Sequence, residues 1–323
     1  MRMNKNRPKI VCLGGGTGTY QVLLGLKKYP VDLTAIVCMS DSGGSSGKLR
    51  EEMGILPPGD IRRALLALSD VHIRKNTLSK LFDFRFQNGQ LAGHSLGNLL
   101  LAALVEITGR QDLAIAEASE ILEVSGTVLP VTMDKTDLVA RLKDGTIIRG
   151  ETNIDIREIK PEIAIDEVYL SPKATIYLKA KKAILEADLI VLGPGDLYTS
   201  IIPNLLVSGI SEALIKTKGK LVYICNLMTK HGETDNFKVS EFASEICRYL
   251  GNGADKLKTI VVNGKIDLPI SVAKWYKKYH SEPVVLDKEN LKGWEVISQN
   301  MAQKGKLIRH DSRKLAKILM KLI

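Results

Sequence analysis

The segment Lys9-Ile10-Val11-Cys12-Leu13-Gly14-Gly15-Gly16-Thr17-Gly18-Thr19 decides the fold class of this 323-residue chain. Residues 9–13 are apolar and include β-branched side chains, which is typical of a buried parallel strand, and glycines end that strand. Residues 22–26 continue in a helical pattern, and residues 33–39 form a second apolar stretch. A strand, a helix and a strand within about 30 residues predict a βαβ unit.

The same pattern returns in the second half of the chain. Apolar stretches at residues 188–192, 220–226 and 259–263 predict strands. Helices are predicted from about residue 205 and over residues 239–250. Alternating strands and helices are typical of a doubly wound sheet.

Between the two halves the pattern changes. Residues 61–68, 96–105 and 113–124 are predicted helices, whereas residues 139–150 predict a β-hairpin that turns on Asp144-Gly145. The expected fold class is therefore α/β, with a mostly parallel sheet and a small antiparallel hairpin insertion near residues 139–150.

The end of the chain predicts an amphipathic helix. Residues 312–323 place apolar side chains on one face and lysines on the other, so we expect this helix to dock on the core. No repeat or low-complexity linker separates the halves. We expect one compact unit, in which residues 1–250 form the core and the basic residues 251–323 complete the same domain.

The composition excludes several classes of protein. With 45% hydrophobic and 25% charged residues it is ordinary for a globular chain, and no apolar run approaches the ~18 residues of a membrane span. The basic N-terminus lacks the apolar stretch of a signal peptide. The four cysteines are far apart and indicate neither a zinc site nor a disulfide framework. We expect a soluble, cytoplasmic protein.

The net charge of +10 is concentrated near the end of the chain. Residues 251–323 hold 15 Lys and Arg against 7 Asp and Glu, and residues 274–280 interleave lysines with aromatic side chains. This pattern is compatible with contact to RNA or an acidic partner, or with a solvated face of a helix. Because no nucleic-acid motif accompanies it, we do not expect nucleic acid to be the partner.

Three loops follow predicted strands at the edge where doubly wound sheets bind ligands. The first, residues 14–19, has glycines that let the backbone approach a phosphate at a helix N-terminus. The alternative is a tight strand-to-helix turn. The third glycine of the dinucleotide fingerprint is replaced by Thr19, so we expect neither a nicotinamide nor a flavin cofactor.

The second loop, residues 40–50, resembles a P-loop but has Ser42 and Leu49 where glycine and a hydroxyl residue are needed. Asp41 closes the strand and is a candidate to hold a hydroxyl group or a metal ion; its other interpretation is a turn residue. Asp60 is a candidate ligand contact or a helix cap.

The third loop is residues 193–200, and a further polar loop spans residues 226–235. Their length and polarity exceed what simple turns need. His94, at the start of a predicted helix, is a candidate base or phosphate contact, or a structural histidine. No Ser-His-Asp spacing and no nucleophile stand out. These loops indicate a nucleotide or phosphate ligand but no particular reaction.

In their order along the chain, these motifs resemble the family of the bacterial gluconeogenesis factor YvcK, which is similar to the archaeal 2-phospho-L-lactate transferase CofD. The segments that carry the resemblance are Gly14-Gly15-Gly16-Thr17-Gly18, Asp41-Ser42-Gly43-Gly44-Ser45-Ser46-Gly47, Pro57-Pro58-Gly59-Asp60-Ile61-Arg62, Gly93-His94-Ser95-Leu96-Gly97-Asn98, Gly193-Pro194-Gly195, Leu197-Tyr198-Thr199-Ser200, Asn226-Leu227-Met228-Thr229 and Gly232-Glu233-Thr234. They span residues 9–235, and the ordered set is far more specific than any one of them.

The resemblance implies a Rossmann-like, three-layer α/β/α fold and a nucleotide-binding core. YvcK-type members look like cytoplasmic binders of UDP-sugars, tied to carbon metabolism, gluconeogenesis and the regulation of cell shape. CofD-type members are transferases that move a phospholactyl group from a guanosine diphosphate carrier to a deazaflavin alcohol with magnesium. The intact glycine-serine loop places this chain nearer the YvcK type, with the transferase as the alternative.

The expected ligand is a nucleotide-sugar or a nucleotide diphosphate, with Mg²⁺ as the possible ion at Asp41 and with a homo-oligomer as the expected assembly. No catalytic residue is predicted. The expected ligand-binding residues are Gly15, Gly16, Thr17, Gly18, Asp41, Ser42, Gly59, Asp60, His94, Asn98, Gly193, Gly195, Tyr198, Thr199, Asn226, Met228 and Thr229.

Three departures from the family pattern bear on which nucleotide is bound. Ser42 stands where a second aspartate is common, and Asp196 stands where serine is usual. Lys230-His231 replaces a usual Gln-Pro, and we expect it to offset the charge of Asp196.

Overall fold

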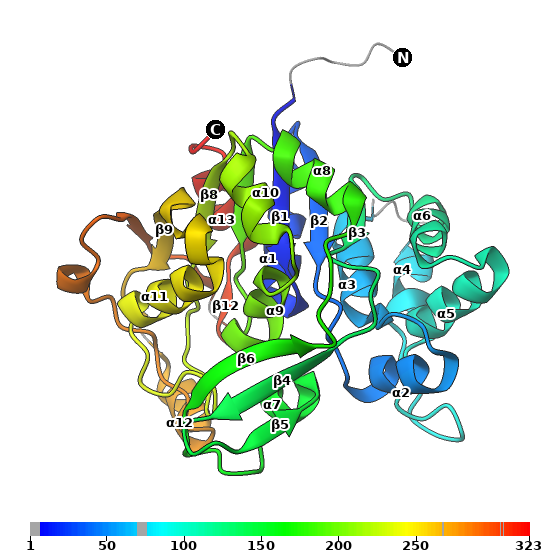
Figure 1. The fold of residues 1–323 in the computed structure, drawn as a ribbon, viewed down its shortest axis with the longest axis horizontal. Helices are drawn as coiled ribbons and strands as arrows, with labels where there is room; N and C mark the ends of the chain where they lie inside the picture. Colours follow the sequence, from blue (N-terminus) through cyan, green and yellow to red (C-terminus); the bar gives the residue numbers. More distant parts are fainter. Residues whose placement is uncertain (1–6, 70–75, 267, 304, 306) are drawn as a thin grey trace.

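The computed structural model describes residues 7–69, 76–266, 268–303, 305 and 307–323. Its centre is a seven-stranded sheet in the order β10-β9-β8-β7-β1-β2-β3, in which every neighbouring pair is parallel (Figure 1). The strands are β1 (Lys9–Gly14), β2 (Asp32–Val37), β3 (Thr127–Pro130), β7 (Leu189–Leu192), β8 (Lys220–Ile224), β9 (Leu257–Asn263) and β10 (Glu295–Gln299). The predicted α/β class with a mostly parallel sheet is confirmed.

The strand order reverses between β1 and β7. From β1 the chain moves outward to β2 and β3, and from β7 it moves outward in the other direction to β8, β9 and β10. Both central strands are almost wholly buried, as continuous apolar strands of a parallel sheet are. Such a reversal leaves a crevice at the carboxyl ends of the strands, where ligands bind in open α/β sheets.

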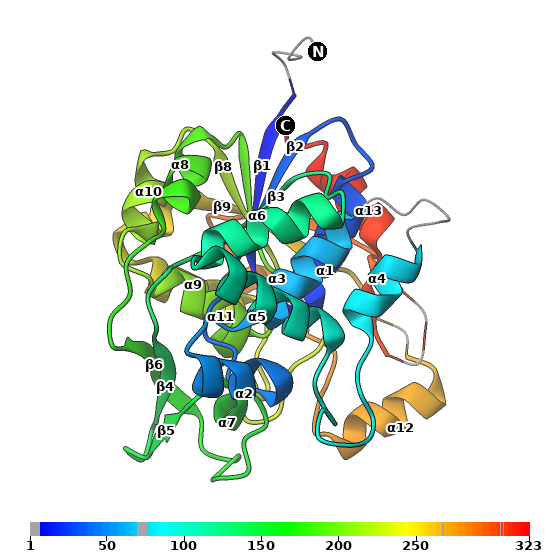
Figure 2. The ribbon, with the colours of Figure 1, turned by 90° about the vertical axis from the view of Figure 1, so that its right-hand side faces the viewer.

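Helices cover both faces of the sheet, which gives the expected three layers (Figure 2). One face carries α1 (Gly16–Leu26), α3 (Pro58–Leu68) and α13 (Ser312–Leu319), and the other carries α8 (Leu178–Glu186), α10 (Ile210–Lys216) and α11 (Val239–Leu250). The terminal helix α13 docks on α1 as predicted, with its Leu315, Ile318 and Leu319 side chains buried. Gly25 permits the contact, since a Cβ there would lie 2.1 Å from the Ser312 carbonyl oxygen.

The remaining helices surround this core. They are α2 (Gly44–Met53), α4 (Asn76–Asp83), α5 (Leu96–Thr108), α6 (Gln111–Ile121), α9 (Ile202–Leu205) and α12 (Ile270–Lys278), with short 3₁₀ turns at Gly251–Lys256 and Lys288–Asn290 and a small antiparallel pair β11 (Ala302–Gln303) and β12 (Arg309–His310). None of the helices in the described part of the chain has the length and apolar character needed to cross a membrane.

The insertion is a small antiparallel sheet at the carboxyl edge of the main sheet (Figure 1). The predicted hairpin is present as β4 (Asp137–Leu142) and β5 (Ile147–Arg149), and a third strand, β6 (Ile165–Ser171), pairs with the other side of β4. Immediately after β5 comes the five-residue helix α7 (Glu151–Asp155). The insertion therefore brings α7 over the crevice.

Two predicted loops are partly helical. The glycine-serine loop after β2 turns into α2 at Gly44, and the loop after β7 becomes a π-helical turn at Leu197–Ile201 that continues into α9. Both changes shorten the irregular stretch of the loop. They also direct the first turn of a helix toward the crevice.

Candidate functional site

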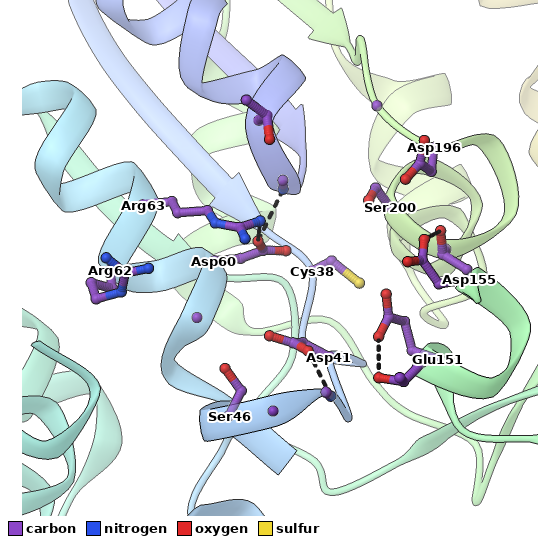
Figure 3. Close-up of a pocket in the computed structure, with 18 of the residues that line it drawn as sticks. Cys38, Asp41, Ser46, Asp60, Arg62, Arg63, Glu151, Asp155, Asp196 and Ser200 are labelled. Atoms are coloured by element: carbon purple, nitrogen blue, oxygen red, sulfur yellow. Dashed lines mark hydrogen bonds and ion pairs between the residues drawn. The ribbon is translucent and has the colours of Figure 1, made fainter. Parts of the chain in front are cut away.

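A cavity of about 430 Å³ lies at the carboxyl edge, between the start of α1 and the insertion (Figure 3). Nine of the residues predicted from the sequence line it: Gly16, Thr17, Gly18, Asp41, Gly59, Asp60, Asn98, Gly195 and Thr199. They come from five separate segments, which the strand-order reversal brings together. The volume is within the ~300–1,000 Å³ range of small-molecule sites.

The first turn of α1, which consists of Gly16, Thr17 and Gly18, forms one side of the cavity. Gly15 precedes the helix without a side-chain cap, and the Gly16 N–H donates to Asp60 Oδ1 at 2.9 Å. Gly18 packs on the next loop so closely that a Cβ would lie 2.1 Å from the Pro194 carbonyl oxygen. The first turn of a helix presents N–H groups with no partner within the helix and a positive dipole end, both of which favour an anion.

Asp41 and Asp60 meet beside this turn. The Gly43 N–H donates to Asp41 Oδ1 at 2.9 Å, so Asp41 also makes the turn that was its alternative interpretation. A Cβ on Gly59 would lie 2.5 Å from both Asp41 Oδ2 and Ser46 Oγ, so this glycine leaves room for both groups. Burial, followed by the charge of Asp41, raises the pKa of Asp60 to about 6, while nearby Arg63 opposes the shift.

Arginine side chains supply positive charge on the same side of the cavity (Figure 3). Arg63 Nη1 lies 3.6 Å from Asp60 Oδ1 and is half exposed. Arg62 is buried and donates from Nε to Asn98 Oδ1 at 3.1 Å. The Asn98 amide group in turn donates to Ser45 Oγ at 3.2 Å. Asn98 lines the cavity and also fixes the orientation of Arg62.

We call this side of the cavity the α1–α3 wall. Its members are Gly16, Thr17, Gly18, Asp60, Arg62 and Arg63. It combines helix-start backbone, of which the Gly16 N–H bonds to Asp60, with the guanidinium groups of Arg63 and of Arg62, which also pairs with Asp83 at 2.7 Å. Asp60 is the one carboxylate among its members.

The opposite side is acidic, and we call it the acidic wall; its members are Glu151, Thr152, Asp155 and Asp196. The first three belong to α7 and Asp196 to the loop after β7. Burial, followed by the charges of Asp41 and Asp155, raises the pKa of Glu151 to about 8. Thr152 donates from Oγ1 to Glu151 Oε2 at 3.2 Å.

Sequence reasoning missed the α7 residues. No local motif marks them, because α7 has only five residues and its position over the crevice depends on how the insertion packs. The one available signal was that they directly follow a predicted hairpin. Arg63 of α3 and Arg85 also line the cavity and were not predicted, although Arg63 directly follows the motif that contains Asp60 and Arg62.

Lys230 lies behind the acidic wall among three carboxylates. Its Nζ is 2.9 Å from Asp196 Oδ2, 2.9 Å from Glu233 Oε1 and in contact with Asp155 Oδ1. The expectation that Lys230 offsets the charge of Asp196 is confirmed. The next residue, His231, instead pairs with Asp235, at 2.9 Å between Nδ1 and Oδ1.

Several predicted residues lie outside the cavity lining. Tyr198 points to α11, where its hydroxyl donates to Glu245 Oε1 at 3.0 Å. His94 is buried behind the lining and shares a 3.2 Å hydrogen bond with Ser45 Oγ. The Thr229 N–H donates to the Glu282 carbonyl oxygen at 2.7 Å, and Met228 forms a β-bridge with Pro283.

The other four predicted residues outside the lining support its loops. Asn226 donates from Nδ2 to the Gly195 carbonyl oxygen at 2.8 Å, and Ser42 Oγ accepts from the Thr152 N–H at 3.1 Å. Gly15 and Gly193 lie next to residues that line the cavity. These residues shape the site from behind.

The donor groups around Asp41 fit a magnesium ion. Mg²⁺ prefers oxygen ligands and is commonly held by one or two carboxylates together with phosphate oxygens. Asp41, Asp60 and the Ser46 hydroxyl provide such oxygens on the cavity surface. Among the described residues, a group of three carboxylates with ligand atoms within 4.8 Å occurs at Asp155, Asp196 and Glu233, where the Lys230 ammonium already lies.

Comparisons with known proteins agree with this architecture. The profile of the family described as 2-phospho-L-lactate transferase CofD matches residues 10–302. The chain is 45% identical over 324 residues to the gluconeogenesis factor of Bacillus subtilis, and the match covers 98% of each protein. The gluconeogenesis factor of Halalkalibacterium halodurans is 44% identical over 321 residues, covering 97% of this chain and 96% of that protein.

A solved structure is similar over almost the whole chain. The crystal structure of a Bacillus halodurans protein matches with a TM-score of 0.91 at 41% identity, and the match covers 98% of this chain and 100% of that chain. At this identity the likeness extends beyond the fold to the family.

Proposed function

The chain belongs to the CofD family and is related throughout its length to bacterial gluconeogenesis factors, and from this premise we propose that its pocket binds a nucleotide-sugar of the UDP-sugar class. The observation that carries the proposal is the first turn of α1, which opens onto the cavity with its backbone amides and with Thr17, beside Arg63. A diphosphate bound there would accept hydrogen bonds from the amides and charge-assisted bonds from the guanidinium. The nucleoside and the sugar would extend along the cavity on either side.

Mg²⁺ completes this proposal because the cavity is too acidic to bind a diphosphate unaided. Lys230 neutralises part of the charge of Asp155 and Asp196, which leaves Asp41, Asp60 and Glu151 facing the arginines. Two carboxylates beside a diphosphate repel it, and a divalent cation between them reverses the sign of that interaction. Asp41 and Asp60 would hold the ion, which would supply charge neutralisation when bound.

A binder of this kind fits a regulatory role in carbon metabolism and cell shape. Among the cavity residues that the structure describes, the Ser45 hydroxyl is the one beside a histidine, at 3.2 Å from His94 Nδ1, and it also accepts from the Asn98 amide group, so it belongs to the hydrogen-bond network that holds the lining. The relatives carry the name gluconeogenesis factor. We propose that the occupancy of the site by a UDP-sugar reports the supply of that metabolite.

The experiment is a thermal-shift panel of UDP-sugars, UDP, GDP and GTP, each with and without Mg²⁺. We expect a rise in Tm confined to UDP-sugars, because a ligand that binds only the native state stabilises it by about 2.7 kcal/mol at a hundredfold excess over Kd. Asp41→Ala and Thr17→Ala should each weaken binding at least about tenfold, the scale of one lost charge-assisted hydrogen bond.

Arg110→Gln is the control, since Arg110 pairs with Asp112 on the surface, away from the cavity. Unchanged affinity in both the Asp41 and Thr17 variants would contradict the site, and no shift with any nucleotide would contradict the function.

A CofD-like transferase is the second candidate, and the raised pKa values of Asp60 (about 6) and Glu151 (about 8) favour it. Carboxyl groups that exchange protons near neutrality suit acid–base chemistry. An acceptor alcohol oxygen would bond to the phosphorus of the phospholactyl group, the bond to the nucleoside monophosphate would break, and the alcohol proton would pass to a carboxylate. Release of GMP from a guanosine diphosphate donor, dependent on a deazaflavin alcohol and Mg²⁺, would establish this candidate over the binder.

A further inference from the structure

Lys230 is the centre of a partly buried charge cluster that the proposed function does not use. It lies on the loop between β8 and α11 and is about one-quarter exposed, while the Glu233 side chain beneath it is fully buried. Its ammonium group contacts one carboxylate from each of three segments: Asp155 of α7, Asp196 of the loop after β7, and Glu233 of its own loop.

The ammonium group of Lys230 supplies, among these carboxylates, the positive charge that a divalent cation would otherwise supply. The ligand oxygens of the three carboxylates lie within 4.8 Å of one another, a spacing that leaves room for one ion between them. Three carboxylates so close repel each other strongly unless a cation or protons lie among them. Burial raises the pKa of Glu233, whereas the three carboxylates, against the effect of burial, raise the pKa of Lys230 and keep it charged.

The same cluster sets the position of the cavity lining. Asp155 is the last residue of α7, and Asp196 follows Gly195 directly. Glu233 also accepts from the Tyr198 N–H at 3.2 Å and from the Thr199 hydroxyl at 3.4 Å. Through these contacts Lys230 ties the insertion to the π-helical turn after β7.

We infer that Lys230 is a resident cation that positions the acidic wall and holds the place a divalent ion would otherwise take between Asp155, Asp196 and Glu233. It acts through the wall and not on the ligand itself. One consequence rests on the proposed function: the acidic wall needs no added metal, so that any exchangeable ion belongs at Asp41 and Asp60. A second consequence does not depend on any nucleotide: without the charge of Lys230, the three carboxylates of the ligand-free protein should bind a divalent ion.

The test is Lys230→Gln, which keeps the length of the polar side chain and removes its charge. Mn²⁺ binding is counted by electron paramagnetic resonance on wild type and variant without nucleotide. We expect the variant to bind one more Mn²⁺ per chain than the wild type, because the three carboxylates then accept the ion. A purely structural lysine would change the melting temperature but not this number.

Nucleotide affinity gives the second readout, with the UDP-sugar that shifts the wild type most. In Lys230→Gln we expect the nucleotide affinity to fall about ten- to a hundredfold, because the carboxylates of the acidic wall lose the group that positions them. The affinity should recover when Mn²⁺ is added in excess of what the wild type needs. Lys9→Gln is the matched control, because Lys9 makes an exposed ion pair with Glu186 and is the first residue of β1, at the end of that strand opposite to the cavity. It should change neither the Mn²⁺ count nor the affinity.

A second variant keeps the proposal falsifiable if Lys230→Gln does not fold. Lys230→Gln with Asp196→Ser removes one carboxylate along with the lysine, so it should fold and should bind no additional Mn²⁺. An unchanged count in folded Lys230→Gln, or an additional ion in the double variant, overturns the inference. If no UDP-sugar binds the wild type, the proposed function fails, and the Mn²⁺ count still decides the role of Lys230.

Discussion

The two walls of the cavity are built in opposite ways. The α1–α3 wall consists of the first turns of two helices on one face of the parallel sheet, and it presents backbone amides and arginines; α1 follows β1 directly, and α3 follows α2. The acidic wall comes from an insertion and a neighbouring loop, and its Asp155 and Asp196 are stabilised by one lysine from a third segment. Helices packed on the sheet fix the first wall, whereas side-chain contacts between distant segments fix the second.

The difference indicates a division of labour. The amide groups of the α1–α3 wall belong to the frame of the fold and suit the part common to every nucleotide diphosphate. The acidic wall is held by ion pairs, which are more easily altered by substitution. In the proposed complex it would face the part of the ligand that differs from one nucleotide diphosphate to another. Of the three departures that the resemblance implies, Asp196 is a member of the acidic wall, Lys230 lies directly behind it, and the Ser42 hydroxyl accepts from the Thr152 N–H of that wall.

The largest effect is expected at Gly18 of the α1–α3 wall, which packs on the loop that carries Asp196 of the acidic wall. Gly18→Ala would raise helix propensity, which alone stabilises an exposed helix by up to about 1 kcal/mol. Here the new Cβ would lie 2.1 Å from the Pro194 carbonyl oxygen, and relieving this clash would require the backbone itself to move. We expect a net loss of about 2–3 kcal/mol in the free energy of unfolding, measured by urea denaturation.

Gly264→Ala is the control for that variant, because its nearest neighbour would be Ser298 Oγ at 3.6 Å. It should change the free energy of unfolding by less than about 0.5 kcal/mol. Stabilisation by Gly18→Ala would show that the walls do not meet at this point.

An intermediate effect concerns pH and the α1–α3 wall. The proposed Mg²⁺ would bind the carboxylate form of Asp60, whose pKa is raised to about 6, so protons would compete with the ion as the pH falls through that value. We expect the Mg²⁺ affinity measured by calorimetry to fall about tenfold from pH 7 to pH 5. Asp60→Asn should bind more weakly at pH 7 and show a flatter profile; an identical profile would remove Asp60 from the ion site.

The smallest effect is expected behind the acidic wall. Tyr198→Phe removes a hydroxyl that donates to Glu245 and does not reach the cavity. The free energy of unfolding should fall by about 1 kcal/mol, the net value of a typical hydrogen bond, and nucleotide affinity should stay within about twofold. A tenfold loss of affinity with unchanged stability would instead make Tyr198 a direct ligand contact.

Much of the frame could be predicted from the sequence because it depends on local patterns. The strand at residues 9–13, the helix Val239–Leu250 and the hairpin at Asp144-Gly145 each follow from apolar periodicity or turn chemistry over a few residues. The strand β6 was missed, since it is separated from the hairpin and its pairing with β4 is a long-range contact. The expected homo-oligomer stays a prediction.

The site divides along the same line. The sequence by itself determined that glycine-rich turns and Asp41 follow strands of a parallel sheet, and this places them at one edge, since parallel strands end together. Only the tertiary structure decided that Glu151 and Asp155 complete the cavity, that Tyr198 turns away from it, and that Lys230 joins three carboxylates. The physical reason is that ion pairs and insertion packing connect residues far apart in the chain, which no local pattern encodes.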